Sequence, residues 1–129
     1  MARLVLLAAV ILSAASLAAA QERAPSPDLV ARNLAENVLG EGTVRSVRVV
    51  SGGRQIVITW DAVLYRPTQT RAKNREQLRG EAELATGAVM GVLKPSLIRF
   101  TMLLNDRPLA QGTRSSDVFT ITYAKELDG

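Results

Sequence analysis

Hydrophobic residues recur along the chain with two different periods, and the period changes several times. Where they return every three or four residues, over about residues 27–39 and 73–93, the pattern predicts amphipathic helices. Where they alternate with polar residues, the pattern predicts strands with one buried side. The predicted strand segments are 43–50, 54–66, 97–105, 109–114 and 118–124, the last two being either one strand interrupted at residues 115–117 or two short strands.

Glycine, proline and small polar residues mark the ends of these segments. Ser26-Pro27-Asp28 is typical of a helix start, because serine can cap free backbone N–H groups and proline suits the first helical position. Gly40 and Pro95 are placed to end the two helices. Ser51-Gly52-Gly53 and Asn105-Asp106-Arg107-Pro108 predict turns between strands.

The apolar positions of each segment predict which residues form the core. On the strands they include Trp60, which we expect at the centre of the core, with Phe100 and Phe119 also inward. The predicted apolar stripes of the helices are Val30, Leu34 and Val38 with Ala31 and Ala35 in the first, and Leu78, Ala82, Ala85, Val89 and Val92 with Leu84, Ala88 and Leu93 beside them in the second.

The order of the segments (α-β-β-α-β-β) predicts an α+β fold. The simplest arrangement is a four- to five-stranded, mainly antiparallel sheet with two helices on one face. The length fits a single α+β domain over residues 27–125, preceded by a short flexible N-terminus at residues 21–26. The last few residues are expected to fray.

The sheet face away from the helices is predicted to be the more polar one. We expect it to be exposed to solvent or to form a contact surface, and Thr120 and Thr122 belong to it. An ion pair across the sheet is expected between Asp61 and Arg99. The residues of the candidate interaction surface are Thr59, Asp61, Tyr65, Arg99 and Thr101.

Residues 1–20 have the layout of a secretory signal peptide. Arg3 precedes a continuous apolar run, and Ala18 and Ala20 form a small-residue cleavage motif before Gln21. The chain is therefore expected to be exported, either periplasmic or secreted. The alternative is an uncleaved membrane anchor, for which the run is of marginal length. An alanine-rich leader, no cysteine and a preference for arginine over lysine suggest a bacterial origin.

The chain of 129 residues contains neither histidine nor cysteine. This excludes Ser-His-Asp and Cys-His catalysis, thiol redox chemistry and nearly all zinc, copper and haem sites, so we expect no cofactor and no metal. Without disulfides, stability must come from a packed core. The formal net charge of +4 comes from interspersed arginines and acids, which is typical of a solvated surface and predicts no nucleic-acid partner.

Two groups of residues in the second helix are candidates for chemistry or packing. Glu81 and Glu83 are two residues apart, so their side chains diverge by about 200° and are expected on a solvated face. Gly80, Gly87 and Gly91 each cost roughly 1 kcal/mol relative to alanine inside a helix. Their first interpretation is close packing on the sheet or on the first helix. A homodimer through this glycine face and simple tolerance at exposed sites are the alternatives.

These observations predict a non-enzymatic binding module whose partner is an unknown protein or a second copy of the chain. Contact with a membrane is expected only through an uncleaved signal segment. One alternative is a carrier of a small apolar ligand, held between the long helix and the sheet by Trp60, Met102 and Leu84. Another is an enzyme such as a carboxylate-dependent hydrolase. The side chains available to it are Asp61, Glu81 and, as a nucleophile, Lys94.

Overall fold

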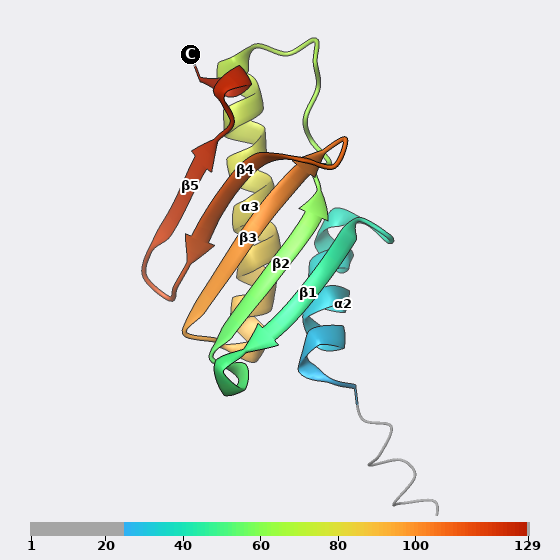
Figure 1. Ribbon diagram of the computed structural model, residues 1–129, viewed down its shortest axis with the longest axis vertical. Coiled ribbons are helices and arrows are strands. Elements are labelled where there is room, and N and C mark those ends of the chain that lie inside the picture. Colours follow the sequence, from blue (N-terminus) through green and yellow to red (C-terminus); the bar gives the residue numbers. More distant parts are fainter. Residues whose placement is uncertain (1–24, 129) are drawn as a thin grey trace, which may run out of the picture.

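The computed structural model describes residues 25–128 of the chain (Figure 1). The predicted signal peptide, residues 1–20, and the first part of the predicted flexible N-terminus lie outside this range. In chain order the elements are α2 (Pro27–Leu39), β1 (Val44–Val50), the 3-10 turn η1 (Ser51–Gly53), β2 (Gln55–Asp61), α3 (Arg71–Leu93), β3 (Leu97–Leu104), β4 (Arg107–Arg114), β5 (Phe119–Tyr123) and the 3-10 turn η2 (Lys125–Leu127). Over the described range, neither α2 nor α3 is both long and apolar enough to cross a membrane.

The five strands form one sheet in the order β1-β2-β3-β4-β5. β2 and β3 run parallel and are joined by α3, whereas the other neighbouring pairs are antiparallel. This confirms the predicted α+β class and the mainly antiparallel sheet, and the segment 109–124 forms two strands rather than one. Asn105 and Asp106, with φ of 51° and 63°, form the two-residue turn that joins β3 to β4.

Both helices lie close to their predicted positions. α2 has the expected bounds, but the Ser26 hydroxyl makes no capping bond to the helix, contrary to prediction. The Ser26 side chain beside it lowers the pKa of the Asp28 carboxyl group. α3 begins at Arg71, two residues earlier than expected, because the Thr70 hydroxyl accepts a hydrogen bond from the Lys73 N–H (3.1 Å) and so caps the helix.

The core lies between the sheet and the helices. In Figure 1, α3 runs behind the sheet, and α2 lies behind β1, against which it packs. Trp60 is fully buried, as predicted. Its ring stacks on Phe100 with centroids 5.7 Å apart, and the rings of Phe100 and Phe119 stack at 5.6 Å. A row of aromatic rings therefore links β2, β3 and β5 inside the core.

Three residues of the predicted apolar stripes, Val38, Leu84 and Val92, are exposed in the structure. Val38 is 42% exposed, whereas Ala31 and Ala35 are fully buried. Because α2 packs against both α3 and β1, the side with the smallest residues, which allows the closest approach, faces inward. On α3, Leu84 and Val92 are 63% and 59% exposed and so lie outside the core.

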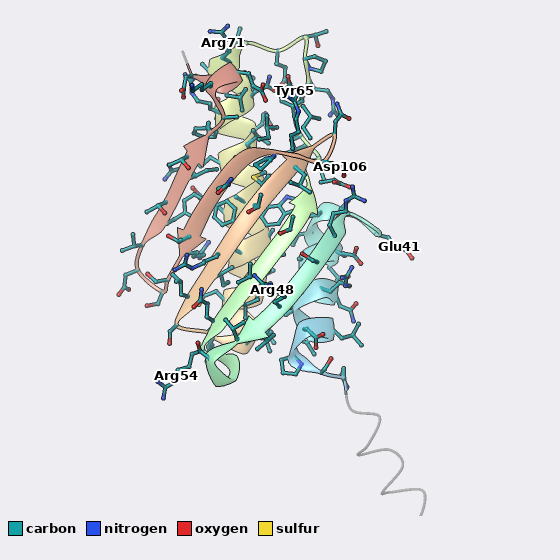
Figure 2. All side chains as sticks on the ribbon, viewed as in Figure 1. Glu41, Arg48, Arg54, Tyr65, Arg71 and Asp106 are labelled. Carbon is teal, nitrogen blue, oxygen red and sulfur yellow. The ribbon has the colours of Figure 1, made fainter. Side chains whose placement is uncertain are left out.

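β2 ends at Asp61, five residues before its predicted end. Side chains of α3 bind the backbone of the following loop, which therefore cannot continue in the sheet. Asn74 accepts a hydrogen bond from the Arg66 N–H (3.1 Å) and donates one to the Arg66 carbonyl oxygen (2.9 Å). Tyr65, predicted on a strand, consequently lies in this loop, half-buried against the core (Figure 2).

Residues 125–128 pack on α3, contrary to the expected fraying. Leu127 is buried in the core. The guanidinium of Arg75 donates to the Leu127 carbonyl oxygen, and that of Arg71 donates to the Asp128 carbonyl oxygen (3.2 Å). The Tyr123 hydroxyl donates to the Arg75 carbonyl oxygen (3.1 Å), and burial raises the pKa of this tyrosine. These contacts fix the end of β5 against the N-terminal half of α3.

Candidate functional site

One surface of the sheet faces away from the core and presents mainly hydroxyl, amide and guanidinium groups (Figure 2). Because side chains alternate along each strand, the strand register decides which of them are neighbours. One row across the sheet joins Thr59 to Thr101, then to Gln111 and Thr122. We call this surface the open face. Its central side chains are Ser46, Arg48, Val57, Thr59, Arg99, Thr101, Gln111, Thr113, Thr120 and Thr122, and Val50, Gln55, Leu97 and Leu103 lie on the same side toward the strand ends.

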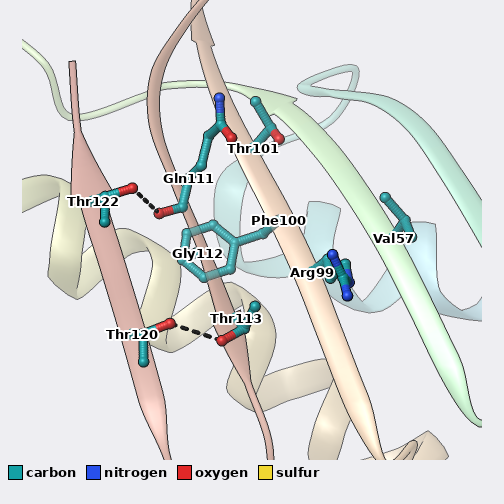
Figure 3. A pocket seen from close by; sticks show the side chains of 9 residues that line it. All are labelled: Val57, Arg99, Phe100, Thr101, Gln111, Gly112, Thr113, Thr120 and Thr122. Atoms are coloured by element: carbon teal, nitrogen blue, oxygen red, sulfur yellow. Dashed lines mark hydrogen bonds between the residues drawn. The ribbon is translucent and has the colours of Figure 1, made fainter.

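Two hydrogen bonds order the part of the open face over β4 and β5 (Figure 3). The hydroxyl oxygens of Thr113 and Thr120 are 2.7 Å apart, and the Thr122 hydroxyl donates to the Gln111 carbonyl oxygen at 3.4 Å. A shallow hollow of about 380 Å³ lies over these residues and reaches Arg99 on β3. The open face is thus a broad surface with several fixed polar groups.

The open face carries positive charge without a neighbouring acid. Within residues 25–128, neither Arg48 nor Arg99 forms an ion pair. Asp61 lies at the end of this face, but its carboxylate is 3.2 Å from the Arg45 guanidinium, which also binds Asp106. The acid is therefore neutralised locally, and the two arginines remain available to an anionic group from outside.

The predicted ion pair between Asp61 and Arg99 is wrong. In the parallel register of β2 and β3, Asp61 lies beside Leu103 and Arg99 lies beside Val57. The two charged residues therefore stand at different levels of the sheet. Alternation correctly assigned both to the same face, but it carries no information on how far one strand is shifted along the next.

The structure brings together three of the five residues predicted as an interaction surface. Thr59, Arg99 and Thr101 are neighbours on the open face, and Asp61 lies at its end. Tyr65 is not part of it, because it belongs to the loop after β2. Sequence reasoning missed some contributors to this surface, namely Ser46, Gln111 and Thr113. In β4 the alternation is weak, since small residues fill its inward positions.

Glu81 on α3 is 3% exposed, which contradicts its predicted solvated position. Its carboxyl group accepts hydrogen bonds from the Trp60 Nε1–H (2.8 Å), the Val63 N–H (3.0 Å) and the Leu64 N–H (2.7 Å). A buried carboxyl group is tolerated when donors of this kind satisfy its oxygens. Glu83, by contrast, lies on the exposed side of the helix as predicted. Glu81 therefore ties the loop after β2 to the core.

The side chains that a hydrolase would need are held apart. Asp61 projects on the open-face side of β2, whereas Glu81 binds Trp60 on the opposite side of the sheet. Lys94 ends α3 in a left-handed conformation (φ 49°), thirteen residues beyond Glu81, which is about 20 Å along the helix axis. Within residues 25–128 no group of three or more acidic side chains converges as a metal site would require.

The residues assigned to an apolar ligand cavity do not surround one space. Trp60 and Met102 are fully buried, whereas most of the Leu84 side chain is in contact with solvent. Leu84 lies on the outer side of α3, so it cannot line a cavity between that helix and the sheet.

The three glycines of α3 have different surroundings. Among residues 25–128, a Cβ atom added to Gly80 or Gly91 would meet nothing within 4 Å, so neither glycine is needed for packing within this range. A Cβ on Gly87 would lie 3.3 Å from a guanidinium nitrogen of Arg114. That guanidinium crosses the helix and donates to the Glu83 carbonyl oxygen (3.0 Å). Of the three glycines, only Gly87 is closely packed, and its neighbour is the Arg114 side chain.

Gly80→Ala and Gly91→Ala are each expected to raise the free energy of unfolding by about 1 kcal/mol, because alanine is the better helix former and the added methyl group has room. Gly87→Ala should raise the free energy of unfolding by less, because the Arg114 side chain must move. Chemical denaturation, followed by the fluorescence of Trp60, measures the free energy of unfolding of all three variants, since Trp60 is the only tryptophan of the chain. A loss of stability at Gly80 or Gly91 would indicate that a second molecule covers this face.

No family model matches the chain, and comparison with curated proteins and with solved structures likewise gives no match.

Proposed function

We propose that this chain is an exported, periplasmic or secreted, non-enzymatic binding module and that the open face is its binding surface. The proposal rests on Arg48 and Arg99, which form no ion pair among residues 25–128 and lie on an exposed surface among fixed hydroxyl and amide groups. We take both helices to pack on one surface of the sheet, as viewed in Figure 1, so that the other is left free.

The chemistry of the open face favours an acidic protein as partner. Guanidinium groups bind carboxylates through two parallel hydrogen bonds, and hydroxyl and amide groups add neutral donors and acceptors. Arg48 and Arg99 flank Val57 in one row of the sheet, so a partner with two acidic side chains would meet both. Complementary charge of this kind contributes mainly to specificity and to the rate of association.

A photo-reactive residue at Thr101 tests the surface in the living host. We expect ultraviolet light to crosslink this variant to a distinct protein. The same residue at Glu76, exposed on α3, should not give that adduct. Equal adducts from both positions would contradict a binding surface on the open face.

In the Thr101 photo-crosslinking variant, the charge reversal Arg48→Glu with Arg99→Glu is expected to remove the adduct. The free energy of unfolding should change by less than about 0.5 kcal/mol, because both arginine side chains are exposed. Arg54→Glu with Lys73→Glu is the matched control, since it changes the net charge equally but lies off the open face. The control should keep the adduct. Loss of the adduct in both double variants would mean that binding depends only on net charge. Persistence of the adduct in both would exclude a role for Arg48 and Arg99 in binding.

A further inference from the structure

β5 forms an edge of the sheet, and none of the described elements covers its outer side. In Figure 1 it is the left-hand strand, and no other element lies beyond it. Within residues 25–128 it pairs only with β4, and this pairing contains no bulge. The strand sequence, Phe119-Thr120-Ile121-Thr122-Tyr123, has neither charge nor proline. β5 therefore lacks the features by which edge strands usually avoid pairing with another chain.

The opposite edge of the sheet is covered by α2 at the first residue of β1 and carries the charged side chains of Arg45 and Arg48. Val44 in β1 accepts a hydrogen bond at its carbonyl oxygen from the Arg32 guanidinium (2.7 Å), and its N–H donates to the Glu36 carboxyl group (3.2 Å). Both partners come from α2. The pairing of β1 with β2 is also irregular between Val44 and Ser46. The contrast indicates that β5 is the edge open to addition of a strand.

We propose that two copies of this chain associate through antiparallel pairing of their β5 strands, centred on Ile121, into one continuous ten-stranded sheet. The sequence of β5 is self-complementary in this register. Thr120 of one copy faces Thr122 of the other on the open-face side, and Phe119 faces Tyr123 on the helix side. Aromatic pairs and threonine pairs opposite one another are among the favourable combinations across antiparallel strands.

The residues that flank β5 are complementary in charge in the same register. Asp117, in the bend before β5, and Lys125, which begins η2 after it, lie just beyond the two ends of the strand, so each Asp117 comes near the Lys125 of the other copy and two symmetric ion pairs can form. Within residues 25–128 neither residue forms an ion pair in the single chain, and both are exposed. Val118, which is 57% exposed, falls opposite Ala124, so the pairing also covers an apolar side chain. The centre and both flanks of the segment therefore agree on one register.

This dimer is independent of what the open face binds. It would place the open faces of the two copies side by side, because the row that ends at Thr122 of one copy continues into Thr120, Thr113 and Arg99 of the other. A partner with repeated acidic groups would then meet two open faces at once, and the linkage of two sites increases apparent affinity without new contacts.

A charge-swap series tests the register. We expect sedimentation of the purified protein, from micromolar to millimolar concentration, to show a monomer–dimer equilibrium. Asp117→Lys alone and Lys125→Asp alone should each weaken the dimer roughly tenfold, because two attractive pairs become repulsive. The double variant restores opposite charges and should return the dissociation constant to near the original value. Monomer at all concentrations, or a dimer that the double variant fails to restore, would overturn the proposal.

A single cysteine gives a second, direct test, because the chain contains none of its own. Residues opposite one another in antiparallel strands have Cα atoms about 4.5–5.5 Å apart, within the range that a disulfide spans. Mild oxidation of Ile121→Cys should therefore yield a covalent dimer. Thr59→Cys, in the middle of the sheet, is the control and should form no covalent dimer under the same conditions, because its cysteine lies far from the β5 edge. A folded Ile121→Cys protein, checked by Trp60 fluorescence, that gives no more covalent dimer than the control contradicts pairing at β5.

Discussion

Glu81→Ala is expected to lower the free energy of unfolding by about 3 kcal/mol and the Tm by more than about 10 °C. The substitution leaves the Trp60 Nε1–H and the backbone N–H groups of Val63 and Leu64 without their acceptor. A buried donor without a partner costs the full penalty of removing it from water. Thermal unfolding followed by circular dichroism measures the effect.

Two further variants separate the hydrogen bonds of Glu81 from its volume. Glu81→Gln keeps the shape but replaces one acceptor oxygen by an NH2 group, so it should lose part of the stability that Glu81→Ala loses. Glu83→Ala, two residues away on the exposed side, removes only a surface ion pair with Arg79 and should change stability by less than about 0.5 kcal/mol. Equal stability of Glu81→Ala and Glu83→Ala would refute the role of Glu81 in holding the loop.

Gly112→Ala is expected to lower the free energy of unfolding by about 3 kcal/mol, because β4 has no space for a Cβ atom at this position. The added atom would overlap the Thr120 carbonyl oxygen and would lie 2.6 Å from Cζ of Phe100. Phe100 stacks on both Trp60 and Phe119, so its ring has little freedom to move away. Either β5 must separate from β4 or the aromatic row must shift.

Hydrogen exchange distinguishes these two responses. Separation of the strands should speed exchange at the amides of β5 more than at those of β2, whereas a shift of the rings should change the fluorescence of Trp60. Gly80→Ala is the matched control, since it adds the same methyl group where nothing lies within 4 Å and should stabilise the protein. Unchanged stability of Gly112→Ala would show that the sheet can accommodate a side chain there.

The sequence predicts the elements of this protein well because hydrophobic periodicity is a local property. α2 has its predicted bounds, the inward and outward side chains of β2 and β3 alternate as predicted, and Trp60 lies in the core. The end of β2 could not be predicted in the same way. Asn74 and Glu81 stop the strand by binding the next loop from a helix that comes later in the chain. The spacing of Glu81 from the apolar residues of α3 is the local signal that it faces inward.

The open face, too, could be predicted from the sequence only in part. Alternation places Thr59, Arg99 and Thr101 on one side of the sheet, and this agrees with the structure. Only the pairing of strands decides that Asp61 binds Arg45 and that Arg99 keeps no acidic neighbour among the described residues. Pairing depends on contacts between residues distant in sequence, which a local pattern does not encode.

The sequence by itself therefore determined the class of fold, the inward positions of the strands and the absence of imidazole and thiol chemistry, because each follows from composition or from a local period. The tertiary structure alone decided which helix face is buried, why Glu81 and Gly112 are required and which edge of the sheet is unprotected. All of these features depend on the distances between elements. A polar or small residue is tolerated at one position and essential at another, according to which groups pack against it.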